Sequence, residues 1–158
     1  MTVEKKKLAR RGIKVIFYLY IIGIFYFVLL SERYGRDTGY DTSHVNLVLF
    51  KEINRFWTYR HLLSTEAVVT NLFGNIFAFS PLGFMIPIVI NKKKAFFRAV
   101  FATSFFSLVI ETSQLIMKVG VFDVDDLLMN TVGGLIGYMI YRVVVAVYDL
   151  YNRKRAAK

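Results

Sequence analysis

The sequence predicts an all-α membrane protein in which four transmembrane helices form a bundle and an amphipathic helix lies at the outer membrane interface. Three observations favour this class. Hydrophobic residues make up 56% of the 158 residues, whereas roughly 45–50% is usual for soluble domains. The chain contains four apolar segments, each close to the length of about 20 residues that crosses a bilayer. The 21 Lys and Arg residues gather beside the ends of these segments, as is typical of membrane proteins.

The first predicted span covers residues 13–30 and follows a basic arm, residues 1–12, which we expect to be cytoplasmic. Lys14 is the only charge in this span and lies near enough to its end to reach the headgroups. A secretory signal peptide is the alternative for such a beginning. Because the residues after Leu30 are Ser-Glu-Arg-Tyr, they lack the small-x-small pattern of a cleavage site. We therefore predict an uncleaved span.

Residues 31–67 form the longest polar region and are predicted to be the outer loop. Within it, residues 45–63 place Leu49, Ile53 and Trp57 at near-helical spacing, with charged residues between them. This pattern predicts an amphipathic helix in the membrane interface, with Trp57 and Tyr59 at headgroup depth. A helix packed on the mouth of the bundle is the alternative.

The second predicted span, residues 68–90, has no charge and contains both prolines of the chain, Pro81 and Pro87. Each proline removes a helical hydrogen bond, so a bend is expected where the carbonyls of Phe77 and Gly83 lose their donors. A re-entrant segment is the alternative, but it would place the lysines of residues 92–94 outside. The positive-inside rule argues against that arrangement.

The third and fourth predicted spans are residues 99–117 and 127–148, and residues 149–158 form a basic tail. All four spans belong to one predicted membrane domain, residues 13–148. With both termini placed in the cytoplasm, 15 of the 21 Lys and Arg residues lie inside. This bias predicts a multi-pass protein with cytoplasmic termini.

Polar side chains from three of the predicted spans converge near the outer end of the bundle. At 1.5 Å per residue, those within the spans lie no more than about 10 Å deep. Charged and amide groups at membrane depth are costly and therefore indicate a functional site. We predict a ligand-binding site that opens to the outer leaflet, formed by Asn71, Asn75, Glu111, Gln114, Asp123, Asp125, Asp126 and Asn130.

Each of these residues also has a purely structural interpretation. The amides could hydrogen-bond across helix contacts, and small residues such as Gly133 and Gly137 let membrane helices approach closely. This favours a compact bundle with a polar outer end and a packed inner end. The acidic group at residues 123–126 could cap the fourth helix, because Asp is a preferred N-cap. Glu111 needs a partner at its depth, and Gln114 and Asn75 are the expected donors.

The stretch from Glu111 to Tyr138 also carries a resemblance. Its pattern E-x-x-Q, a short loop, then F-D-V-D-D-L-x-x-N-T-x-G-G-x-x-G-Y is similar to that of the VanZ-like family of bacterial membrane proteins. The segments Gly74–Pro87 and Asn46–Ile53 resemble two further family motifs, with Leu49 at a position where proline is common. The resemblance implies a bacterial cell membrane protein that affects glycopeptide (teicoplanin) susceptibility or envelope homeostasis. Its expected partners are membrane lipids and either a lipid-linked cell-wall precursor or a glycopeptide.

Two other functions were weighed against ligand binding. A membrane enzyme could use Glu111 and the acidic group to hold a divalent cation and act on a lipid phosphate. A transporter could use Glu111 as a proton site, but four spans without an inverted repeat disfavour it. We expect no nucleic-acid partner, because the basic residues do not form one soluble face. No metal or cofactor is expected, since the chain has no cysteine and two histidines without suitably spaced ligands.

Overall fold

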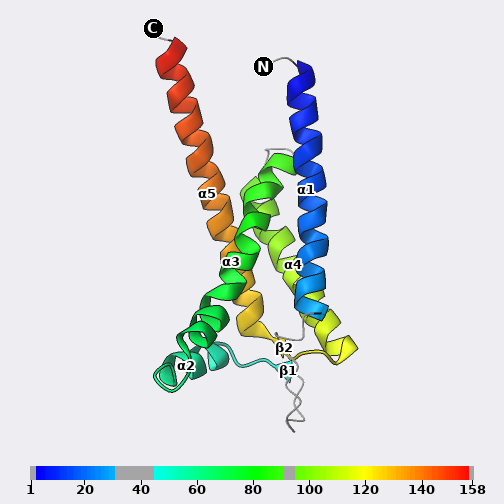
Figure 1. Ribbon diagram of the computed structural model, residues 1–158, viewed down its shortest axis with the longest axis vertical. Helices are drawn as coiled ribbons and strands as arrows, with labels where there is room; N and C mark the ends of the chain where they lie inside the picture. Colours follow the sequence, from blue (N-terminus) through cyan, green and yellow to red (C-terminus); the bar gives the residue numbers. More distant parts are fainter. Residues whose placement is uncertain (1–2, 31–44, 91–94, 157–158) are drawn as a thin grey trace.

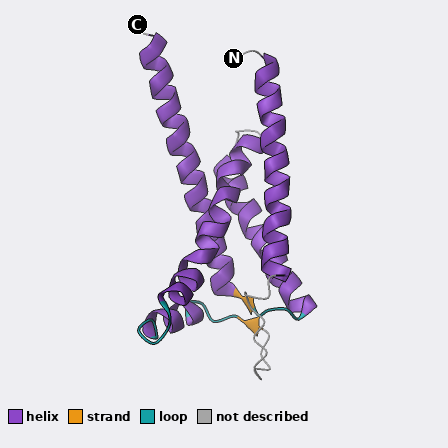
Figure 2. Cartoon of the chain, viewed as in Figure 1, coloured by secondary structure: helices purple, strands orange, loops and turns teal. Residues whose placement is uncertain are grey.

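The computed structural model describes residues 3–30, 45–90 and 95–156 of the chain. The predicted outer-loop residues 31–44 and the lysines of 92–94 lie outside these ranges. The described part consists of five helices and two short strands (Figures 1 and 2). In chain order they are α1 (Val3–Leu30), β1 (Val45–Asn46), α2 (Lys51–Thr58), α3 (Thr65–Val89), α4 (Ala95–Met117), β2 (Phe122–Asp123) and α5 (Val124–Ala156).

Four of these helices, α1, α3, α4 and α5, are long and apolar enough to cross a membrane, which confirms the predicted all-α membrane class. The eight-residue α2 begins within the segment predicted to be amphipathic. Both termini lie at the same end of the molecule, while α2 and the two strands lie at the other (Figure 1). This is the arrangement expected for four helices that each cross a membrane once.

The helix ends follow from local chemistry. Ser64 is the N-cap of α3, and its hydroxyl oxygen accepts the N–H of Ala67 at 3.1 Å. At the end of α4, Lys118 adopts a left-handed conformation with φ of 55°. The N–H of Val119 then bonds back to the carbonyl of Gln114. A left-handed residue just after the last turn is a common helix terminator.

The helix α3 continues through Pro81 and Pro87 without interruption over 25 residues. This continuity supports a full crossing rather than the re-entrant alternative. Pro87 is buried, whereas Pro81 is exposed. The bend expected at these prolines stays a prediction.

The tightest packing lies between α3 and α5, where glycines of α5 face the backbone of α3. A Cβ atom added at Gly137 would collide with the carbonyl of Ser80, and one added at Gly133 would collide with Ile76. Gly83 of α3 meets the carbonyl of Gly134 in the same way. Only residues without a side chain permit two membrane helices to approach so closely.

The core beside this crossing is built from apolar side chains of α1, α3, α4 and α5. Phe79, Leu82 and Ile86 of α3 are fully buried against Ala99 and Ile110 of α4. The first helix joins them from one side, and the hydroxyl of its Tyr20 donates to the carbonyl of Ala78.

The end of the bundle near the termini differs from the packed inner end that we expected. Packing extends along α5 to Tyr138 and Tyr141, but almost all residues from Arg142 to Ala156 are exposed. With 33 residues, α5 is about 50 Å long at 1.5 Å per residue, which exceeds the ~30 Å hydrocarbon core. The helix therefore continues through the basic tail, where Lys, Arg and Ala favour helix.

Candidate functional site

The candidate site lies at the end of the bundle away from the termini, where the two strands, α2 and the first turns of α3 and α5 meet (Figure 1). β1 and β2 pair in parallel, with Val45 opposite Phe122 and Asn46 opposite Asp123. This pairing connects the segment before α2 to the residues that begin α5. Segments separated by more than 70 positions thereby share one site.

Asp123 connects three elements through its side chain and backbone. Its Oδ1 accepts the N–H of Asp125 at 2.8 Å, which makes Asp123 the N-cap of α5. Both of its carboxylate oxygens lie 3.2 Å from Nδ2 of Asn46. Its own N–H donates to Oε2 of Glu111 at 3.1 Å. The predicted capping role of the acidic group therefore belongs to Asp123.

Asp125 accepts backbone hydrogen bonds from another helix, a role that the sequence did not indicate. Its side chain is fully buried and accepts the N–H groups of Phe50, Glu52 and Ile53, the last two at 2.9 and 3.3 Å. These are the unpaired donors at the start of α2, whose own N-cap residue, Phe50, makes no side-chain cap. A carboxylate suits this position because a helix N-terminus carries partial positive charge. Asp125 of α5 thus caps α2.

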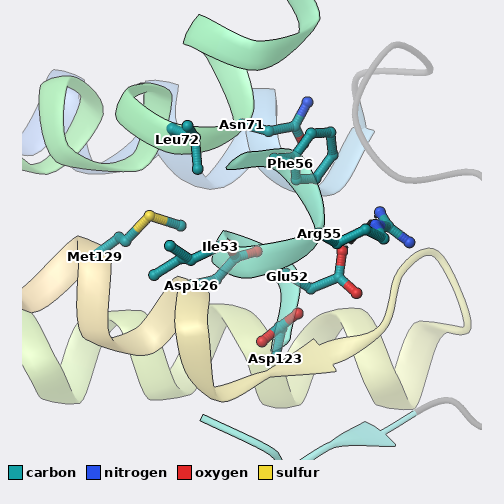
Figure 3. Close-up of a pocket in the computed structure, with 9 residues that line it drawn as sticks. All are labelled: Glu52, Ile53, Arg55, Phe56, Asn71, Leu72, Asp123, Asp126 and Met129. Atoms are coloured by element: carbon teal, nitrogen blue, oxygen red, sulfur yellow. Dashed lines mark ion pairs between the residues drawn. The ribbon is translucent and has the colours of Figure 1, made fainter. Parts of the chain in front are cut away.

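Asp126 points toward a small pocket instead. Its Oδ1 accepts a hydrogen bond from Nδ2 of Asn75 on α3 at 2.6 Å. The pocket has a volume of about 100 Å³ and lies between α2, α3 and α5 (Figure 3). Its polar lining is Glu52, Arg55, Asn71, Asp123 and Asp126, and its apolar lining is Ile53, Phe56, Leu72 and Met129.

The polar lining of the pocket is mainly acidic. It contains three carboxylates and one guanidinium, that of Arg55, which pairs with Glu52 at 2.6 Å. The side chain of Arg55 is 58% exposed, so it lies at the rim. Burial raises the pKa of the Glu52 carboxyl, Arg55 opposes this shift, and the charge of Asp123 adds to it. The pocket therefore favours groups that donate hydrogen bonds or carry positive charge.

Glu111 and Asn130 lie deeper, between α4 and α5, and both are 2% exposed. Glu111 accepts the backbone N–H of Asp123, while Nδ2 of Asn130 donates to Oγ of Ser107 at 2.9 Å. Oδ1 of Asn130 is buried without a hydrogen-bond partner in the described part of the chain. The expectation that Asn75 donates to Glu111 is wrong, because Asn75 faces Asp126 across the α3–α5 contact.

Two of the predicted site residues make only peripheral contributions. Asn71 lines the pocket but is exposed, and its Nδ2 donates to Ala67 of its own helix at 2.8 Å. Gln114 is half-buried, and its side chain lies under the turn at Gly120. Neither residue joins the contacts among the acidic side chains described above.

The carboxylates are not arranged as a set of metal ligands. Within the ranges that the structure describes, no group of three or more His, Cys, Asp or Glu residues could hold a metal ion. The oxygens of Asp123 and Asp125 face N–H donors instead.

The contribution of α2 and of the strand before it to the site was not predicted from the sequence. Asn46 is buried on Asp123, and Glu52, Ile53, Arg55 and Phe56 form one wall of the pocket. A signal for this was present, because Asn46–Ile53 was one of the segments that resembled a family motif. Its role as a partner of the acidic group could not be deduced from spacing.

Comparison with known proteins identifies the family. The VanZ/LLP1 family profile matches residues 17–145, which is most of the chain. The chain belongs to the VanZ/LLP1 family. It is also 27% identical to Protein VanZ of Enterococcus faecium over 138 residues, covering 85% of this chain and 74% of that protein. No solved structure matches the chain significantly. The matched range includes β1, α2 and all of the acidic residues at the site.

Proposed function

We propose that this VanZ/LLP1 family protein is a multi-pass protein of the bacterial cell membrane with both termini in the cytoplasm. Its pocket faces the outer leaflet and binds the polar head of an envelope ligand, which contributes to glycopeptide (teicoplanin) resistance or to envelope homeostasis. The observation that carries the proposal is the pocket itself, in which three carboxyl groups and four apolar side chains line one cavity. Such a lining suits an amphiphilic ligand.

The charge of the pocket restricts the part of the ligand that binds. Phosphate groups would be repelled by Glu52, Asp123 and Asp126, whereas hydroxyl and ammonium groups would donate to them. The sugar or amine portion of a lipid-linked cell-wall precursor meets this requirement, and so does a glycopeptide. Met129 and Leu72 offer apolar contacts beside the carboxylates.

The test is teicoplanin susceptibility of cells that produce the protein and its variants at matched levels. We expect Asp126→Asn to lose the resistance, because the neutral amide keeps a partner for Asn75 but removes one of the three carboxyl groups that line the pocket. Asp149→Asn is the matched control, since Asp149 is an exposed carboxylate near the other end of the same helix. Full resistance with Asp126→Asn would refute the proposal.

A binding experiment separates the two ligand sources. Trp57 is the single tryptophan of the chain and follows Phe56, which lines the pocket. Its fluorescence can be followed in nanodiscs while either teicoplanin or a lipid-linked cell-wall precursor is added. We expect a saturable change with one of them that Asp126→Asn weakens at least tenfold. An unchanged signal with both would count against binding at this pocket.

A further inference from the structure

The walls of the pocket come from two parts of the chain that are held together in different ways. Asn71 and Leu72 belong to α3, while Asp126 and Met129 belong to α5, and these two helices cross at tightly packed glycines. The remaining lining is Asp123 of β2 together with Glu52, Ile53, Arg55 and Phe56, which all belong to α2 (Figure 3). The pocket is therefore closed only while α2 lies against the bundle.

The contacts that hold α2 in place are mainly polar. No residue of α2 is fully buried, and its two apolar side chains at the pocket, Ile53 and Phe56, are only partly buried, so apolar burial anchors this helix weakly. Its first turn is held by the carboxylate of Asp125 through three backbone N–H groups. The preceding strand, β1, is held by its pairing with β2 and by the hydrogen bond that Asn46 donates to Asp123. Release of these hydrogen bonds would free α2 without opening the core.

The backbone that enters α2 is strained. Phe50 adopts a φ of 65°, a left-handed conformation that is unfavourable for residues with a Cβ atom. The side chains before the helix, Leu47, Val48 and Leu49, are more than half exposed and do not pack in the bundle. The exposed turn at residues 59–64 follows α2 and leads into α3. This arrangement places a strained joint before the helix and an exposed joint after it.

We infer that residues 45–58, which comprise β1 and α2, form a hinged lid over the pocket and that Asp125 is its latch. The lid turns about the joint at residues 59–64, and the ligand enters when the first turn of α2 leaves Asp125. This inference rests on the proposed function for the identity of the site. The motion itself is a property of the ligand-free protein and can be measured without any ligand.

The test uses the absence of cysteine in the chain. Met129→Cys places a thiol at the pocket lining, where the native side chain is 6% exposed. The purified protein in nanodiscs is treated with a water-soluble maleimide, and the labelling rate is measured. We expect Asp125→Asn to raise this rate at least tenfold, because both carboxylate oxygens accept N–H groups at the start of α2, whereas the amide keeps one acceptor oxygen and turns its NH2 donor toward the other N–H position.

Two controls show whether the effect is confined to the lid. Ala99→Cys lies in the core of α4, where the native residue is fully buried, and its labelling is expected to stay slow in the Asp125→Asn background. Asp149→Asn should leave the labelling of Met129→Cys unchanged. Equal acceleration at positions 99 and 129 would mean that Asp125 holds the whole bundle, and it would overturn the inference.

A second variant tests the lid in the opposite direction and does not alter the latch. Phe50→Gly removes the cost of the left-handed conformation. The population of the closed state should therefore rise, and labelling at position 129 should slow by at least threefold. A labelling rate that neither Asp125→Asn nor Phe50→Gly alters would overturn the lid. Ligand binding that depends on Asp126 would remain in that case, so the two proposals fail separately.

Discussion

The α3–α5 crossing depends on glycines because two backbones touch there, and this predicts a large effect of a single methyl group. In Gly137→Ala the new Cβ would collide with the carbonyl of Ser80 and with the N–H nitrogen of Phe84. Neither obstacle is a flexible side chain that could turn away, so the two helices must separate. Overpacking of this kind costs about 1–3 kcal/mol.

The same helix pair offers a matched control. A Cβ atom added at Gly74 of α3 would meet only Cγ2 of Thr70 at 3.6 Å, which is an ordinary van der Waals contact. Alanine is favoured over glycine inside a helix by roughly 0.5–1 kcal/mol, so Gly74→Ala should raise stability by that amount. Because the same helix preference applies at both positions, the two variants should differ by the overpacking cost alone, roughly 1–3 kcal/mol.

The free energy of unfolding can be measured in mixed micelles by circular dichroism as SDS is added. Gly137→Ala should unfold at a lower SDS fraction than the parent protein, and Gly74→Ala at an equal or higher one. If Gly137→Ala matches Gly74→Ala, the close backbone contact does not limit the crossing, and the packing argument is wrong.

Three further predictions concern charge and orientation. Burial raises the pKa of Glu52 above its usual value of 4.5, although Arg55 opposes this shift. The folded protein therefore binds this proton more tightly than the unfolded chain, so the parent protein should gain stability relative to Glu52→Gln as the pH falls through the raised pKa. A relative loss of stability in melting experiments would show that the ion pair with Arg55 dominates. Glu111→Gln should retain the fold, because the amide oxygen can still accept the N–H of Asp123, but should lose teicoplanin resistance; retained resistance would show that ionisation there is dispensable. Cysteines introduced at Leu62 and Asn152, both exposed, should label from outside intact cells only at position 62, and labelling at 152 alone would invert the topology.

Apolar length and the placement of charge were sufficient to predict four membrane-crossing helices, whereas the family was indicated by the resemblance of the motif around the acidic residues. They were sufficient because a helix crossing a bilayer satisfies its own backbone, so its apolar length can be recognised without knowledge of its neighbours. Helical spacing also placed Gly133 and Gly137 on one face of α5, where they meet α3. The rise of about 1.5 Å per residue along each predicted span placed the polar residues of α3, α4 and α5 near one end of the bundle.

Only the tertiary structure decided which polar groups pair. Within the acidic group of residues 123–126, Asp123 caps its own helix, Asp125 caps α2, and Asp126 faces the pocket. Neighbouring carboxylates of one chemical type acquire different roles because a helix turns about 100° per residue and directs each toward a different element. The partners of Asp125 are backbone N–H groups more than 70 positions away. Backbone donors carry no sequence signal, so their position depends on how α2 folds back onto the bundle.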